Sequence, residues 1–313
     1  TNVVYGFATT LIKVLEDLHP THIAASFDLA AKTFRHEEYA EYKGTRVKAD
    51  QELYDQIPKV KELLGVFNIP IYALEGFEAD DCIGTISDMF EEKNPKQKFK
   101  DFKVYIVTGD KDAFQLIDGN IFVYNLKHGL LSAQIVDREA ITKDWNLAPE
   151  DFIDLKALAG DPSDNIPGVP GIGNKTATIL LQNFDSLTKL YEKIESIIPI
   201  KEESSEIDLL QDSAIEVAAK EMNLRPRIIR LLVDNKEQAF LSQRLATIRR
   251  DVPLDFKLED CTWGDYDREK VKDFFTNMQF YSLLRRFGAE RGEAPKEKES
   301  QKQKAKDEQL RLL

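Results

Sequence analysis

The first 126 residues alternate between short apolar runs and stretches with helical periodicity, and this alternation limits the possible folds more than any other feature. The apolar runs that we interpret as strands cover residues 22–28, 69–74, 103–109 and 120–126. Helical spacing of apolar residues covers 3–18, 51–67 (interrupted near Pro58) and 76–93. Strands separated by helices predict an α/β fold with a mostly parallel central sheet and helices on both faces.

From about Ile135 onward the sequence shows no convincing strand. Helical candidates cover residues 137–145, 150–160, 174–184, 186–194, 208–222 and 227–250, with two more after Arg268. We therefore predict an α/β domain over residues 1–134, followed by an all-α domain over 135–288. The tail, 289–313, is rich in Lys, Glu and Gln and is expected to be disordered.

The composition limits which binding partners and which cellular compartment we expect. The net charge of −12 argues against a general nucleic-acid binder, although seven Lys and Arg against two acidic residues gather between Arg225 and Arg250. Two widely separated cysteines, Cys82 and Cys261, fit a reducing cytoplasm. No apolar run reaches the roughly 20 residues of a membrane span. We expect a cytoplasmic monomer with no membrane partner.

Carboxylates follow the predicted strands at the ends where ligands bind in parallel sheets. This set consists of Asp28, Glu78, Asp80, Asp81, Asp110 and Asp112, and the stretch AGDPSDN adds Asp161 and Asp164 at the end of a helix. Each piece alone is also typical of a turn or a helix cap. Together, so many like charges in one pocket require cations, and all-oxygen ligands favour two or more Mg²⁺ or Mn²⁺ ions.

The stretch GVPGIGNKTA, residues 168–177, joins two predicted helices through a glycine-rich loop. Its backbone N–H groups and Lys175 suit the phosphates of a nucleic-acid backbone at the start of a helix. An ordinary tight connection between helices is the alternative. The spacing of small, polar and basic positions favours a helix–hairpin–helix, with Gly168, Gly171, Gly173, Lys175 and Thr176 as DNA-binding residues.

The segment KTFRHEEYAEYKGTR interleaves basic and aromatic residues directly after Asp28. Arg35, Lys43 and Arg46 could neutralise a phosphate, and rings such as Tyr42 could stack an unpaired base. A solvated loop is the plainer interpretation of such a charge run. The position of this segment next to Asp28, a predicted metal ligand, favours contact with a phosphate and a base over a solvated loop.

Several motifs, taken together and in this order, resemble the 5′→3′ exonuclease domains of bacterial DNA polymerases I, of the flap endonuclease family. They are VYGF, FDLAAKTFRHEEYAEYKGTR, GFEADD, TGDKD, GDPSDNIPGVPGIGNKTA, NKEQAFLSQRLATIRRDVPL and FYSLLRRFG, and they span nearly the whole chain up to Gly288. The resemblance implies a resolvase-like (PIN-like) nuclease core, followed by a helix-three-turn-helix part that grips duplex DNA. It also implies a metal-dependent hydrolase acting on DNA with a 5′ flap or a 5′ end.

The same resemblance assigns roles to the residues. The eight carboxylates match the family's metal ligands, and Lys43 and Arg46 match basic residues of a helical arch through which a single strand threads. The segment from Gly168 to Ala177 matches the duplex grip, which the family often pairs with K⁺ on loop carbonyls.

The chain departs from the family pattern in three places. The strand that carries a further metal-binding aspartate at the start of the family is absent, and residues 196–223 resemble an insertion. As the third departure, we expect no polymerase domain after the tail. The first departure leaves open a truncated, catalytically impaired DNA-binding module. A single-domain RNA-cleaving nuclease is a more distant alternative, because it has fewer carboxylates and no hairpin.

Overall fold

The computed structural model describes residues 2–91, 94–95, 97–126, 129, 132–198 and 207–288. The chain forms two compact units, each built from separate stretches of sequence. The first unit comprises residues 1–25, 49–71 and 257–313, and the second comprises 26–48 and 72–256. These units cut across the expected division at residue 134, which stays a prediction. The tail at 289–313 lies outside the described residues.

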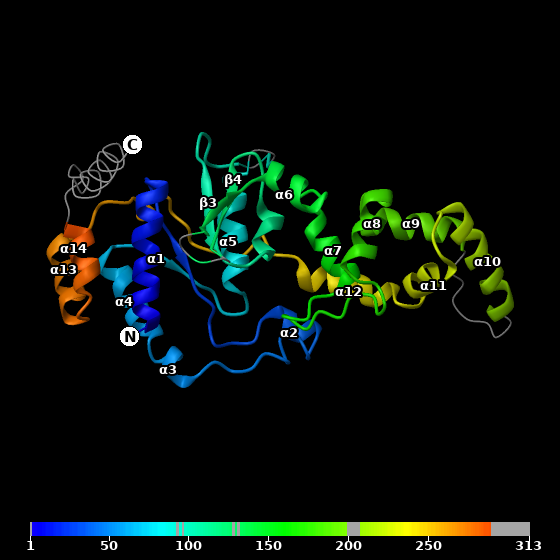
Figure 1. Cartoon of the computed structure of the whole chain (residues 1–313), viewed down its shortest axis with the longest axis horizontal. Helices are drawn as coiled ribbons and strands as arrows, with labels where there is room; N and C mark the ends of the chain where they lie inside the picture. The colour runs from blue at the N-terminus through cyan, green and yellow to red at the C-terminus, as the bar shows by residue number, and fades with distance from the viewer. Residues whose placement is uncertain are drawn as a thin grey trace, which may run out of the picture. The chain divides into compact units, whose positions relative to one another are not determined.

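The first unit is helical where it is described. Its helices are α1 (Asn2–Leu18), α3 (Gln51–Tyr54), α4 (Ile57–Val66), α13 (Arg268–Asn277) and α14 (Tyr281–Gly288), as Figure 1 shows. Helix α1 buries Val4, Ala8, Leu11 and Ile12, the one-sided spacing expected of an amphipathic helix. The predicted interruption near Pro58 is confirmed, because α4 begins with this proline in its first turn.

The second unit contains the sheet that positions the predicted site. Strands β3 (Val104–Thr108) and β4 (Ile121–Asn125) run parallel, with Ile106 opposite Val123. A third strand, β5 (Gln134–Val136), runs antiparallel to β4. The expectation of no strand beyond Ile135 is therefore wrong at its first residues. Two short strands, β1 (Ala25–Ser26) and β2 (Ile71–Tyr72), pair with each other in a separate sheet.

Helix α5 (Ala79–Asp88) and a 3₁₀ turn, η1 (Asp112–Leu116), accompany this sheet. Glu78 and Asp81 form a reciprocal capping box at the start of α5, which explains why acidic residues open this helix. Short α2 (Phe34–Glu38) lies in the basic segment after Asp28. The buried core of this part includes Ile106, Phe114, Leu116, Val123 and Phe152.

The rest of the second unit is helical, as predicted. It contains α6 (Arg138–Trp145), α7 (Asp151–Ala159), α8 (Asn174–Phe184), α9 (Leu187–Ile197), α10 (Ile207–Glu221), α11 (Pro226–Asp234) and α12 (Lys236–Ala246). Helix α7 packs against both α8 and α12. The single helix predicted over 227–250 is instead broken at Asn235, which ends α11 and precedes α12. Among the described helices, none is long and apolar enough to cross a bilayer.

Candidate active site

All eight predicted carboxylates belong to the second unit. Charge effects on the pKa of Asp80 and Asp112 connect six of them, and Lys156 connects Asp161 to Asp112. Asp80, at the start of α5, is the centre of the group. Burial, followed by the charges of Asp110, Asp112, Asp28 and Glu78, raises the pKa of Asp80 to about 7. Asp28 also accepts a hydrogen bond from the Ala79 amide at 2.7 Å, so it is held at the first turn of α5.

The remaining members of the group join through Asp112. Burial raises the pKa of Asp112, and the positive charge of Lys156 lowers it. The negative charges of Asp110 and Asp164 raise it further, and the net result is a rise. Asp110, just after β3, accepts the Asp112 amide hydrogen bond at 3.0 Å. The aspartates that follow β3 thus share one environment with those at α5 and after α7.

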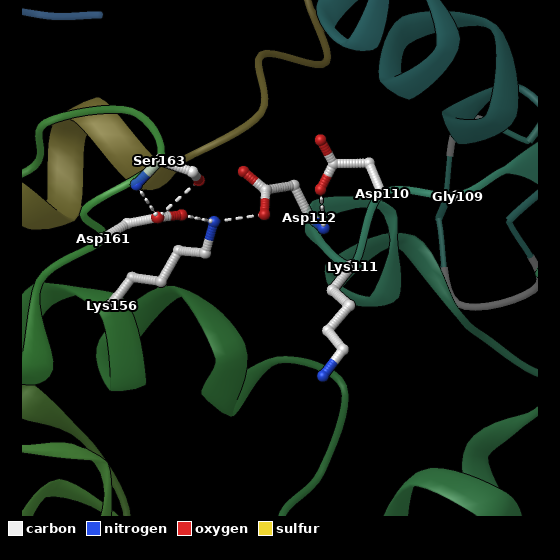
Figure 2. A pocket seen from close by; sticks show the side chains of 7 residues that line it. All are labelled: Gly109, Asp110, Lys111, Asp112, Lys156, Asp161 and Ser163. Atoms are coloured by element: carbon white, nitrogen blue, oxygen red, sulfur yellow. Dashed lines mark hydrogen bonds and ion pairs between the residues drawn. The ribbon is translucent and has the colours of Figure 1, made fainter. Parts of the chain in front are cut away.

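A cavity of about 400 Å³ is lined by three carboxylates of this group, those of Asp110, Asp112 and Asp161. It is lined by Gly109, Asp110, Lys111, Asp112, Lys156, Asp161 and Ser163. Figure 2 shows Lys156, from α7, reaching between Asp112 and Asp161. Asp161 also accepts hydrogen bonds from the Ser163 amide at 2.8 Å and the Ser163 hydroxyl at 2.6 Å. Burial would raise the pKa of Asp161, but its bonds to Lys156 and Ser163 outweigh burial and lower it.

Lys156 was not predicted as a site residue. Burial would lower its pKa, but the two carboxylates outweigh burial and raise it, so the ammonium form is favoured. A lysine in a helix usually keeps its head group in water, which is why the sequence pattern gave no reason to select this one. The available signal was its position five residues before Asp161, at the end of α7.

A second group of cations meets Glu78 and Asp164. Lys43 lies 2.8 Å from Glu78 Oε1 and 3.9 Å from Asp164 Oδ2. The Arg46 guanidinium lies 2.5 Å from Asp164 Oδ1 and is half exposed. The structure therefore brings these two predicted basic residues to Glu78 and Asp164. Lys156, in contrast, contacts the other two carboxylates, Asp112 and Asp161.

Tyr42 has a different position from the one predicted. It is 3% exposed, and its hydroxyl contacts Glu78 Oε2 at 3.2 Å and Asp164 Oδ2 at 3.1 Å. Burial, together with the charges of these two carboxylates, raises the pKa of Tyr42. A ring packed in the interior cannot stack on a base, so we withdraw Tyr42 as a DNA-binding residue and assign it to orienting Glu78 and Asp164.

Arg35 and Asp81 also differ from the prediction. The Arg35 guanidinium donates to both oxygens of Asp81 at 2.8 Å, and to the carbonyls of Leu245 at 2.9 Å and Thr247 at 2.8 Å. Asp81 is fully buried and accepts further hydrogen bonds from the amides of Glu78 and Arg249. With every oxygen occupied, Asp81 is a structural carboxylate, and Arg35 is its partner instead of a catalytic group.

The glycine-rich loop divides into an internal part and an exposed part. Gly168 has φ +62°, and a Cβ there would lie 2.2 Å from the Gly160 nitrogen, where φ is +74°. Its amide donates to Ser242 Oγ at 3.0 Å and its carbonyl accepts from Gln238 at 2.6 Å. Gly168 is therefore required for packing inside the protein, and the prediction that its backbone binds DNA does not fit.

The remaining predicted residues of the loop lie at the start of α8. Gly171, Gly173 and Lys175 are exposed, and Thr176 is half-buried. Gly173 is the N-cap residue and supplies no side chain to the first-turn amides. Unpaired amides at a helix start can receive an anion.

Metal binding can be tested against the donor set. The cavity lining supplies carboxylate and hydroxyl oxygens, which suit Mg²⁺ or Mn²⁺. Burial first, and then the charges of neighbouring carboxylates, raise the pKa of Asp80, and a cation would offset the second of these causes. The residues therefore fit divalent ions. Within the described residues, however, no three His, Cys, Asp or Glu side chains already surround one point. Ions would have to draw these carboxylates away from their present partners.

The sequence matches two consecutive family models. Residues 1–146 match the N-terminal resolvase-like domain of 5′-3′ exonucleases, and residues 147–269 match the C-terminal SAM fold of the same proteins. The chain belongs to the 5′-3′ exonuclease family, whose members are nucleases that hydrolyse DNA. The predicted fold class, a resolvase-like α/β part followed by a helical part, is confirmed.

Among full-length relatives, the chain is 38% identical over 294 residues to DNA polymerase I of Bacillus subtilis. It is 37% identical over 292 residues to DNA polymerase I of Lactococcus lactis (strain IL1403). These matches cover 94% and 93% of the chain but only 30% of each relative. The chain thus spans about 30% of the length of the polymerases it resembles.

Two solved structures share the fold. T5 5′-exonuclease with bound zinc ions superposes with a TM-score of 0.55 and 19% identity, over 91% of this chain and 88% of that one. The catalytic core of Rad2 with a DNA substrate gives a TM-score of 0.52 and 17% identity, over 91% and 83%. At this identity the likeness concerns the fold alone.

Proposed function

We propose that the chain is a metal-dependent 5′-3′ exonuclease and 5′-flap endonuclease that hydrolyses phosphodiester bonds of DNA. The observation that supports this most directly is the mutual electrostatic influence of Asp28, Glu78, Asp80, Asp110 and Asp112, of which Asp110 and Asp112 line a cavity. The family relationship supplies the reaction class. A cytoplasmic monomer acting in replication and repair fits this proposal.

Seven carboxylates would hold two or more Mg²⁺ or Mn²⁺ ions: Asp28, Glu78, Asp80, Asp110, Asp112, Asp161 and Asp164. Such ions would polarise the scissile phosphate and stabilise the charge that develops on its oxygens. T5 5′-exonuclease, which has the same fold, was solved with divalent metal ions. Asp81 is left out of this set because its oxygens are already hydrogen-bonded.

The chain's own cations and amides would position the substrate. Lys43 and Arg46 lie at Glu78 and Asp164, so once metal takes over these carboxylates their charges are available to the phosphate being cut. The start of α8, with Gly173, Lys175 and Thr176, would hold phosphates further along the duplex. K⁺ on carbonyls of the same loop is part of this proposal.

The test is cleavage of a labelled 5′-flap DNA with Mg²⁺, with Mn²⁺ and with EDTA. We expect cleavage with either ion and none in EDTA. Asp110→Asn should reduce the rate by about a hundredfold or more, since part of the metal contribution of several kcal/mol is lost. Asp144→Asn, an exposed change on α6 in the same unit, is the matched control and should cleave normally.

DNA that shifts in a gel but stays uncut at every metal concentration would identify a DNA-binding module of the same fold. Preferential cutting of single-stranded RNA would instead support an RNA nuclease. Either result would reject the proposed activity.

A further inference from the structure

The ammonium group of Lys156 occupies the space between two carboxylates of the proposed metal site. It lies 2.5 Å from Asp161 Oδ2 and forms a direct ion pair with Asp112 Oδ1. The three side chains are each only 15–16% exposed. Water therefore screens this contact poorly, and the positive charge counts for more than that of a surface lysine.

The position of Lys156 is imposed by the fold. It lies on α7 between Leu155 and Ala157, both buried in the helical core, and α7 packs against α8 and α12. Asp161 is held in turn by the amide and hydroxyl of Ser163. This packing fixes the backbone of the lysine, and the ammonium lies at the end of a flexible four-carbon side chain.

The carboxylates near the start of α5 have a different arrangement from the Asp112–Asp161 pair. Asp28 accepts a hydrogen bond from the backbone amide of Ala79, and Asp110 accepts one from the backbone amide of Asp112. An amide orients a carboxylate without cancelling its charge. The negative charges of Asp28 and Asp110 are therefore not offset by these amides, whereas Lys156 offsets those of Asp112 and Asp161.

We propose that Lys156 is a built-in cation that takes the place of a divalent ion between Asp112 and Asp161 until metal binds there. This inference rests on the proposed metal site. Loading this side requires the ammonium to move away or to remain beside the ion at a repulsive distance. This side accordingly binds metal more weakly than the side formed by Asp28, Asp80 and Asp110.

The experiment is Mn²⁺ titration of the full chain by isothermal calorimetry, together with thermal unfolding in EDTA and in Mn²⁺. Lys156→Met keeps the stem and removes the charge. We expect its weaker class of Mn²⁺ sites to tighten by about tenfold, corresponding to relief of part of the charge repulsion. In EDTA its melting temperature should fall by several degrees, and the rise on adding Mn²⁺ should exceed that of the unaltered chain.

Lys111→Met is the matched control. Lys111 lines the same cavity, but its ammonium lies over the Trp145 ring, 4.2 Å from the centroid, and points away from the Asp112–Asp161 pair in Figure 2. The loss of one positive charge is the same. Metal affinity should change by less than about twofold, because this charge is not between the two carboxylates.

Unchanged or weaker Mn²⁺ binding in Lys156→Met, with normal binding by the unaltered chain, would overturn the role of Lys156 and leave the proposed function standing. Absence of Mn²⁺ binding by the unaltered chain would overturn both. If Lys156→Met is unfolded in EDTA, Mn²⁺ should restore its structure; failure of Mn²⁺ to do so also counts against the inference.

Discussion

Two carboxylate–cation groups in the second unit contain predicted metal ligands, yet they differ in how complete they are. Asp81 is wholly buried, and its two oxygens accept from Arg35 and from two backbone amides. Asp112 and Asp161 share one lysine on the wall of an open cavity. The first group is satisfied by the protein alone. The second has a single cation, Lys156, for two carboxylates.

The difference shows that residue type does not decide the role of a carboxylate. Asp80 and Asp81 are neighbours, but successive positions on a helix point in different directions, so one faces other carboxylates and the other faces Arg35. A carboxylate that donors already surround has no capacity for an ion. One that repels its neighbours gains from binding an ion.

The largest effect is expected from breaking the buried Arg35–Asp81 pair. Arg35→Ala would leave Asp81 buried without its countercharge and should reduce the free energy of unfolding by about 3–5 kcal/mol. Burial alone would lower the pKa of Arg35, but its bonds to Asp81 outweigh burial and raise it, so the guanidinium stays charged in the fold. Urea denaturation followed by circular dichroism measures the loss.

The control for this change is Arg138→Ala. Arg138 pairs with Glu150 at 2.8 Å, with side chains 39% and 61% exposed, so removal should cost no more than about 1 kcal/mol. Similar losses for the two variants would show that burial does not separate the Arg35–Asp81 pair from a surface pair.

A smaller effect is expected from pH acting on Asp80, whose charge acts on Asp110 and Asp112. Because the pKa of Asp80 is raised to about 7, the fold favours its protonated form. That stability is fully present below the ordinary pKa of an aspartate and is lost as the pH rises through about 7. In EDTA, the melting temperature should fall by a few degrees between pH 5 and pH 8.

Saturating Mg²⁺ should flatten this pH dependence, since a bound cation favours the charged carboxylate. Asp80→Asn in EDTA should flatten it too, because asparagine does not titrate. A pH dependence in EDTA that persists unchanged in Asp80→Asn would assign the titration to another group.

The smallest effect is expected from a pair between these extremes. Arg46 contacts Asp164 at 2.5 Å and the Ser163 carbonyl at 3.2 Å, but it is half exposed. Arg46→Ala should therefore change the free energy of unfolding by less than about 1 kcal/mol in EDTA, as measured by urea denaturation. A loss as large as that of Arg35→Ala would mean that exposure is not what separates the two groups.

Periodicity predicted most of the fold because its strands and helices bury regular faces. Helix α1 is an example, with buried residues at helical spacing, and strand β4 is another, because its apolar run buries Ile121, Val123 and Tyr124. Strand β5 was missed because its residues, QIV, are few and mostly exposed, so they leave no apolar run. The break at Asn235 was missed because apolar spacing continues through it on both sides.

The sequence predicted which residues form the site, but their roles in it depend on burial and on contacts within the fold. Sequence spacing identified the carboxylates that meet near Asp80, but it could not show which oxygens backbone amides already occupy, as at Asp81. Nor could it show that Tyr42 is turned inward or that Lys156 crosses to Asp112, forty-four positions away. These outcomes depend on contacts between segments that are distant in the chain.

The close approach of Gly160 and Gly168 has a consequence for any substrate held at α8. Backbone touches backbone there, and Val169 donates to the Leu158 carbonyl at 2.8 Å, so the loop that carries Asp161 and Asp164 is pinned at both ends. If α8 holds the duplex and the aspartates face the bond being cut, these contacts fix the distance between the binding site and the cleavage site. Product length would then be set by the geometry of the protein, and lengthening the loop would move the cut along the DNA.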